Sequence, residues 1–149
     1  TDCLHRLQEI FSALRGIAKQ MQVILPLHPR TQKILTQKNI SIQGITILEP
    51  VSYLEMIWLL RSCKVVLTDS GGLQKEAYFC KKPCLTLRDE TEWVELVEKG
   101  YNTIVGANQE KIIQHFSKIA DNSSIEFCKT LYGNGRAAEI IMQTIKESL

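Results

Sequence analysis

The chain has 149 residues, of which 44% are hydrophobic and 23% are charged, and its formal net charge is +2. This length suits one domain with its own core, and the balanced charge excludes the strongly basic surface expected of a nucleic-acid-binding protein. Because no apolar run reaches the roughly 18 residues of a membrane span and the first residues are polar, we expect neither a transmembrane helix nor a signal peptide.

The first half of the chain predicts helices and strands in alternation. Asp2 is a candidate cap of a first helix, and Ser52 is a candidate cap of a later one. The apolar runs between the helices are short and alternate little with polar residues, as in strands that are buried on both faces. The expected helices cover residues 4–20, 31–37 and 53–62, and the expected strands cover residues 23–27, 45–48 and 65–67.

The second half continues the same alternation, with a loop expected around residues 121–126. Repeated strand–helix units with buried strands predict an α/β fold with a doubly wound, mostly parallel, Rossmann-like sheet in one domain. The expected helices cover residues 72–80, 92–98, 109–120 and 136–149, and the expected strands cover residues 84–87 and 102–105.

The five cysteines do not predict a disulfide framework or a zinc site. Their number is odd, and Cys80 and Cys84 lack a second pair at the spacing of a zinc site, so no metal is predicted. We expect reduced, mostly buried thiols in a cytoplasmic protein.

The stretch from Val65 to Ala77 joins an apolar strand to a helix through a Ser-Gly-Gly turn. Glycines allow the backbone to approach a ligand closely, and the first N–H groups of a helix favour an anion. We therefore expect a phosphate at Ser70, Gly71 and Gly72, although Ser70 also fits a simple helix cap. Glu76, one turn later, is either a surface carboxylate or an acceptor for the hydroxyls of a ribose.

Polar residues also follow other predicted strands, and ligands bind beyond the carboxyl ends of an open parallel sheet. His28 precedes Pro29 and is either a loop residue or part of a site, and Arg88 is either an exposed cation or a phosphate ligand. Met56 is by default a core residue. The sequences GxGxxG and GxxxxGK[ST] are absent, so the usual dinucleotide and P-loop sites are excluded and no cofactor is predicted.

Several motifs together resemble the non-hydrolysing UDP-N-acetylglucosamine 2-epimerases. TDSGGLQKEA at residues 68–77 is similar to the TDSGG(I/L)QEE motif of that family, and KPCLTLRDETEWVE at residues 82–95 is similar to its GKPxLxxRxxTERPE or TEWxE motif. LPLHPRT, ILEPVSYLEMIWLLRSC and YGNGRAA resemble further family motifs, at residues 25–31, 47–63 and 132–138. The resemblance covers nearly the whole chain.

The resemblance implies that residues 1–149 are most of the C-terminal, UDP-binding domain of a two-domain protein, one half of a glycosyltransferase-B architecture. Thr1-Asp2 is similar to the end of an HR(R/A)EN motif, and the N-terminal domain is absent from this chain. The implied reaction interconverts UDP-GlcNAc and UDP-ManNAc by elimination and re-addition of UDP. Its acid and base carboxylates belong to the N-terminal domain, so this chain has no predicted catalytic residue and is expected to be inactive alone.

The resemblance also implies binding roles. Ser70, Gly71 and Gly72 hold the diphosphate, Glu76 holds the ribose, and Arg88 contacts the nucleotide sugar at the cleft. The implied partners are a UDP-sugar and the missing N-terminal domain, and a homodimer of the full-length protein is compatible with the family.

Three further positions are assigned from the same motifs. His28 is placed at the interdomain cleft. Val51 and Met56 stand where family members often have Gln and Phe near the uracil, so Val51 offers only its backbone and Met56 a flexible wall. Lys75 replaces a common acid and is expected on the surface.

Two alternatives to this function remain open. One is a hydrolysing epimerase that releases free ManNAc, or a glycosyltransferase of the same architecture. The other is a degenerate nucleotide-binding or interaction module without catalysis.

Overall fold

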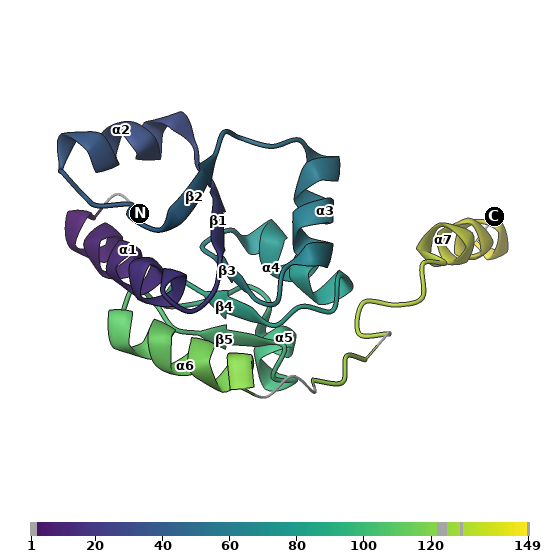
Figure 1. Ribbon diagram of the computed structural model, residues 1–149. Helices are drawn as coiled ribbons and strands as arrows, with labels where there is room; N and C mark the ends of the chain where they lie inside the picture. Colours follow the sequence, from purple (N-terminus) through teal and green to yellow (C-terminus); the bar gives the residue numbers. More distant parts are fainter. Residues whose placement is uncertain (1–2, 122–124, 129, 149) are drawn as a thin grey trace.

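The computed structural model describes residues 3–121, 125–128 and 130–148 (Figure 1). The predicted cap at Asp2, the motif end at Thr1-Asp2 and the loop residues 122–124 lie outside the described residues.

Strands and helices alternate along the chain, as the sequence predicts. Many boundaries match the expected ones, and the others differ by one or two residues. The elements are α1 (Leu4–Ala18), β1 (Val23–Pro26), α2 (Pro29–Gln37), β2 (Ile45–Leu48), α3 (Tyr53–Ser62), β3 (Val66–Thr68), α4 (Gly71–Phe79), β4 (Cys84–Thr86), α5 (Val94–Glu98), β5 (Asn102–Ile104), α6 (Gln109–Asp121) and α7 (Ala137–Glu147).

Local capping explains where several helices begin. The Ser52 hydroxyl accepts a hydrogen bond from the Glu55 N–H at 3.4 Å, and the Ser52 N–H donates to the Glu55 carboxylate at 2.7 Å, a capping box that starts α3. The α2 helix starts earlier than expected, at Pro29, because proline suits the first position of a helix and His28 caps it. The α5 helix starts later, because Trp93 has a non-helical backbone.

All strand pairs are parallel, which confirms the predicted α/β class. The predicted single sheet is divided, however, into a β1–β2 pair and a β3–β4–β5 sheet. The Leu27 N–H donates to the Leu48 carbonyl of β2. Because successive backbone N–H groups of a strand point to opposite edges, the nitrogen of Pro26 faces the other edge of β1. Proline has no proton to donate there, which weakens any pairing between β1 and the larger sheet.

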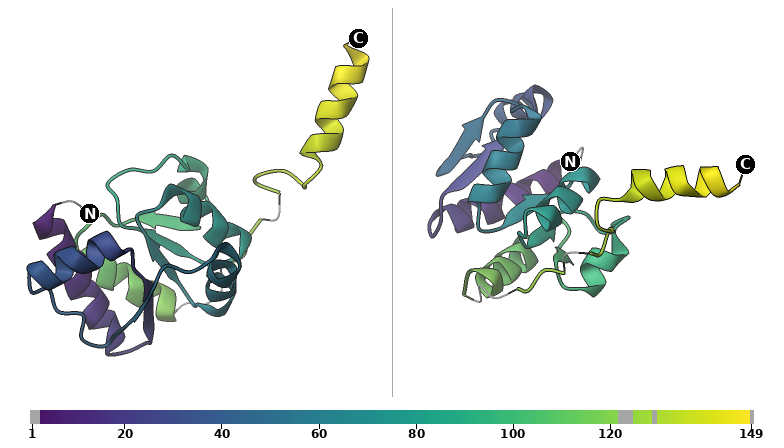
Figure 2. Two further views of the ribbon diagram at one scale, coloured as in Figure 1. Left: turned by 90° about the horizontal axis from the view of Figure 1, so that it is seen from above. Right: turned by 90° about the vertical axis from the view of Figure 1, so that its right-hand side faces the viewer.

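One hydrophobic core joins both sheets to α1 and α6. Figures 1 and 2 show these two helices together on one side of the strands, with α3 and α4 on the other side, so the fold is doubly wound. A smaller cluster lies between α3 and α4, and a third lies around α5. Residues of the main core include Leu7, Phe11 and Leu14 of α1, Ile112 and Phe116 of α6, and Leu85 of β4.

The α7 helix extends away from this body and has no buried residue (Figure 2). No helix within the described ranges is both long and apolar enough to cross a bilayer.

The prediction of mostly buried thiols is wrong. Only Cys84 is buried, where burial raises the pKa of its thiol to about 12. Cys63 and Cys80 are half-buried, because they lie at the ends of α3 and α4. Cys3 and Cys128 are exposed, because they lie outside the helices and strands, and all five thiols are free.

Candidate functional site

The turn between β3 and α4 has the features of an anion site. Ser70 caps α4, since its hydroxyl accepts a hydrogen bond from the Leu73 N–H at 3.5 Å, and the Ser70 N–H donates to the Thr68 hydroxyl at 3.0 Å. Gly71 and Gly72 form the first turn of the helix. Within the described residues, their N–H groups have no hydrogen-bond acceptor in the protein. The turn therefore presents two free donors at the positive end of the helix dipole.

A buried amide holds this turn in place. Gln74 is fully buried, and its side-chain N–H donates to the Ser70 carbonyl at 3.3 Å. Its amide oxygen accepts hydrogen bonds from the Thr91 hydroxyl at 2.6 Å and from the Asn102 side chain at 2.8 Å. Asn102 in turn accepts a bond from the Thr86 hydroxyl at 2.7 Å. The turn between β3 and α4 is thus connected to β4, to β5 and to the loop after β4.

Trp93 also holds the turn, through a hydrogen bond to its backbone. Its indole N–H donates to the Gly71 carbonyl at 2.8 Å. The Lys75 ammonium lies over the rings of Trp93 and Tyr132, at 4.4 and 4.2 Å from their centres. Lys75 is therefore half-buried in cation–π contacts and is not the free surface residue expected from the sequence.

Arg88 is brought to the same helix terminus. Its guanidinium pairs with the Glu92 carboxylate at 3.0 Å. The other oxygen of Glu92 lies against Gly71, so closely that a Cβ at Gly71 would overlap it. The structure therefore brings Arg88 close to Gly71, the first residue of α4, with the Glu92 carboxylate between them.

The loop that carries Arg88 is anchored by its neighbour. Asp89 accepts a hydrogen bond from the Arg6 guanidinium at 2.7 Å, and this pairing lowers the pKa of the Asp89 carboxyl. Asp89 also lies against Gly106, where φ is +61° and a Cβ would come within 2.8 Å of the carboxylate. Glycine meets both requirements at this position.

Glu76 lies one turn beyond Gly72 on the same face of α4, because residues four apart are neighbours on a helix. The residue is half-buried, and in the described part of the chain no hydrogen bond or ion pair involves its carboxylate. The carboxylate is thus available to accept hydrogen bonds from a ligand that is held at the turn.

His28, Val51 and Met56 are not joined to this turn by any hydrogen bond or ion pair among the described residues. His28 is exposed and caps α2, its ring nitrogen Nδ1 accepting a bond from the Arg30 N–H at 3.2 Å. Met56 packs against the cluster between α3 and α4, which matches its default interpretation as a core residue. Val51 is half-buried in the segment that precedes α3.

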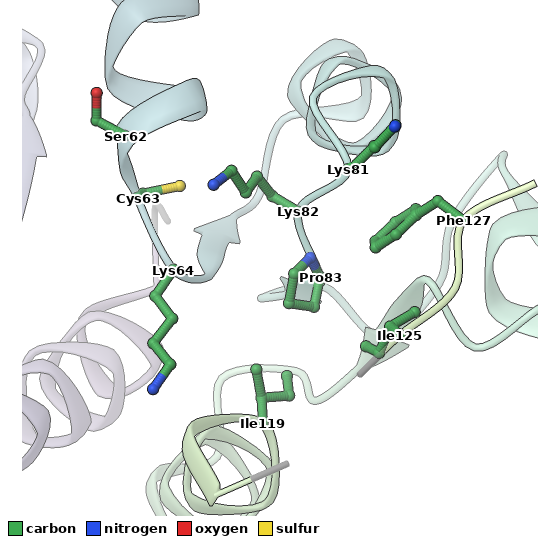
Figure 3. Close-up of a pocket in the computed structure, with 9 residues that line it drawn as sticks. All are labelled: Ser62, Cys63, Lys64, Lys81, Lys82, Pro83, Ile119, Ile125 and Phe127. Atoms are coloured by element: carbon green, nitrogen blue, oxygen red, sulfur yellow. The ribbon is translucent and has the colours of Figure 1, made fainter. Parts of the chain in front are cut away.

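Two hollows lie away from the turn. One, of about 330 Å³, is lined by residues that precede β3 and β4, including Lys64, Lys81 and Lys82 (Figure 3). The three ammonium groups point in different directions, and Lys64 donates to the Ala120 carbonyl at 3.0 Å, so they do not converge on an anion. The other, of about 440 Å³, lies on the outer face of α3 beside Leu54 and Trp58. Among the described residues, no group of His, Cys, Asp and Glu side chains could hold a metal ion.

Sequence reasoning missed the supporting residues of the turn. No supporting role is predicted from the sequence for Gln74, Thr91 and Trp93, although their hydrogen bonds hold the turn. The available signal was a polar residue in each of two predicted buried strands, Thr86 in β4 and Asn102 in β5.

Residues 1–146 match the family model described as UDP-N-acetylglucosamine 2-epimerase. A UDP-2,3-diacetamido-2,3-dideoxy-D-glucuronate 2-epimerase from Pseudomonas aeruginosa is 44% identical over 144 residues, which are 96% of this chain and 40% of the relative. A UDP-N-acetylglucosamine 2-epimerase from Methanocaldococcus jannaschii is 43% identical over 128 residues, which are 83% of this chain and 34% of the relative.

Solved structures show the same likeness. The M. jannaschii UDP-GlcNAc 2-epimerase in complex with UDP-GlcNAc and UDP has a TM-score of 0.84 at 37% identity, over 98% of this chain and 42% of that one. The Neisseria meningitidis UDP-GlcNAc 2-epimerase bound to UDP-GlcNAc has a TM-score of 0.75 at 31% identity, over 95% of this chain and 41% of that one. The chain therefore spans well under half the length of these proteins.

Proposed function

Since this chain belongs to the UDP-N-acetylglucosamine 2-epimerase family, we propose that it is the UDP-binding part of an enzyme that epimerises a UDP-linked 2-acetamido sugar at C2. The observation that carries this proposal is the turn at Ser70, Gly71 and Gly72, with free N–H donors and Arg88 beside them. A diphosphate is the part of a UDP-sugar that such a turn suits, because N–H donors, a helix dipole and a guanidinium all favour phosphate oxygens.

Glu76 extends the site to the ribose. A nucleotide whose phosphates lie at the start of α4 has its ribose within reach of the next helical turn, where Glu76 offers a carboxylate without a protein partner. A carboxylate accepts hydrogen bonds from the two ribose hydroxyls in a bidentate manner. Beyond the ribose, Val51 and Met56 are the proposed neighbours of the uracil, and His28 remains a proposed residue of the cleft.

The proposed reaction requires UDP to stay bound to this chain between its elimination and its re-addition. Loss of the C2 proton and breakage of the bond between C1 and the phosphate oxygen release UDP and form a glycal. Addition of UDP back to C1, with a proton delivered to the other face of C2, gives the epimer. The chain's own residues hold the leaving diphosphate and stabilise its charge, while the acid and base groups belong to the rest of the longer protein.

The identity of the sugar has two candidates. UDP-GlcNAc is favoured by the family model and by the M. jannaschii relative. UDP-2,3-diacetamido-2,3-dideoxy-D-glucuronate is favoured by the P. aeruginosa relative, which is 44% identical. Both sugars carry the same UDP group, so the proposed role of Ser70, Gly71, Gly72, Glu76 and Arg88 is common to them.

The proposal is tested in two steps. Titration of the chain with UDP in a calorimeter should show binding, and absence of binding at millimolar UDP would favour a module without nucleotide function. The longer protein should then convert one of the two UDP-sugars into its C2 epimer, with exchange of the C2 proton for deuterium in D₂O. Release of a free sugar would instead indicate a hydrolysing epimerase, and dependence on an acceptor would indicate a glycosyltransferase.

A further inference from the structure

The Glu92 carboxylate lies beside the start of α4 and next to Arg88. One carboxylate oxygen contacts Gly71, the first residue of the helix, and the other pairs with Arg88 at 3.0 Å. The helix dipole and the guanidinium both favour negative charge at this point. The Glu92 carboxylate thus already pairs with Arg88 and fills the space beside Gly71, while the N–H groups of Gly71 and Gly72 have no acceptor among the described residues.

The Glu92 side chain is free to leave this position, whereas its backbone is not. The side chain is 46% exposed, and Arg88 is its only charged or hydrogen-bonding partner among the described residues. The neighbouring residues are fixed, since Thr91 bonds to Gln74 and the Trp93 indole bonds to the Gly71 carbonyl. Rotation of the Glu92 side chain would therefore open the site without any movement of the loop.

We propose that Glu92 is a built-in competitor for the diphosphate. When a UDP group binds, its phosphate oxygens take the place of the Glu92 carboxylate at Gly71 and at Arg88, and the carboxylate turns towards solvent. This inference rests on the proposed binding of UDP at the turn.

If Glu92 competes with the diphosphate, the Glu92→Gln substitution should change the affinity for UDP in a definite direction. Glu92→Gln removes the competing charge, keeps the size of the side chain and leaves Arg88 unpaired. We expect UDP to bind about three- to tenfold more tightly, because an exposed ion pair and a carboxylate at a helix terminus each stabilise only modestly. If Glu92 instead held Arg88 in place for the ligand, the same variant would bind UDP more weakly.

Calorimetric titration of the chain with UDP compares the wild type with Glu92→Gln and with Glu90→Gln. Glu90 is exposed two residues away and forms no hydrogen bond or ion pair within the described part of the chain, so its variant changes the net charge equally and serves as the control. Tighter binding by Glu92→Gln alone supports the proposal. Unchanged or weaker binding, or an equal gain in Glu90→Gln, overturns it.

Two further measurements distinguish failure of the proposed UDP binding, failure of the proposed competition and a loss of stability in the variant. If the wild type binds no UDP, the proposed function fails, and titration with inorganic pyrophosphate still tests the competition in the same variants. If Glu92→Gln unfolds at a lower temperature than the wild type, Glu92→Ser is measured instead. A gain for pyrophosphate in either Glu92 variant supports the competition, and the absence of a gain rejects it.

Discussion

Replacement of Gln74 by Met tests whether the buried amide of Gln74 holds the turn between β3 and α4. Met has a similar length and no hydrogen-bonding amide, so the variant keeps most of the packing and removes the three hydrogen bonds of the Gln74 side chain. Asn102 is only 2% exposed, and its side-chain N–H loses its acceptor in the variant. Thr91 loses its acceptor as well, but it is half-buried and closer to water.

The expected loss of stability follows from these contacts. Each hydrogen bond contributes about 0.5–1.5 kcal/mol net, and an unsatisfied buried donor costs about 1–3 kcal/mol. Since the bonds to Thr91 and Ser70 are partly replaced by water, we expect the free energy of unfolding to fall by about 2–4 kcal/mol. For a domain of this size, such a change lowers the melting temperature by roughly 2–4 °C for each kcal/mol.

Urea unfolding followed by far-UV circular dichroism measures this change, and Asn102→Ala completes a double-mutant cycle. We expect the two substitutions together to cost less than the sum of their separate effects, because they remove the same bond. A loss of less than about 1 kcal/mol for Gln74→Met, or full additivity with Asn102→Ala, would refute the assignment of Gln74 as the support of the turn.

Three other predictions concern single groups. Glu76→Ala should weaken UDP binding by about 1–3 kcal/mol in calorimetry, and an unchanged affinity would show that Glu76 does not bind the ribose. Iodoacetamide followed by mass spectrometry should label the exposed Cys3 and Cys128 first and Cys84, with its pKa of about 12, last; early labelling of Cys84 would contradict its burial. Arg6 lowers the pKa of Asp89 in the folded chain, so as the pH falls the unfolded chain takes up this proton first. The pair therefore adds its full contribution to the free energy of unfolding above about pH 4. That contribution is lost as the pH falls through the lowered pKa of Asp89. Asp89→Asn should therefore destabilise the chain at neutral pH and have little effect near pH 2, and a constant difference across pH would contradict this.

Local signals in the sequence predicted the elements of the fold well. The Ser52 cap correctly located the start of α3, and the Ser-Gly-Gly turn located the start of α4 to within one residue. Both features depend on residues a few positions apart, so spacing alone carries the information.

Contacts between distant parts of the chain were not predictable in this way. Gln74 meets Asn102 across 28 residues, and Trp93 meets Gly71 across 22 residues. Periodicity identifies a buried face of a helix but not the partner that it meets. The division of the sheet also depends on a long-range detail, since the edge that Pro26 presents is known only once the pairing of β1 with β2 is known.

The isolation of α7 has a consequence for its own helical order. The helix has 11 residues, and four of its large apolar side chains are 50–63% exposed: Ile140, Ile141, Met142 and Ile145. Helices shorter than about 12–15 residues are marginal in water without tertiary packing. In this chain by itself, the amide hydrogens of α7 should exchange with solvent far faster than those of α1, whose face is buried in the core. The exchange rate of α7 is therefore a direct reporter of whether any surface has packed against it.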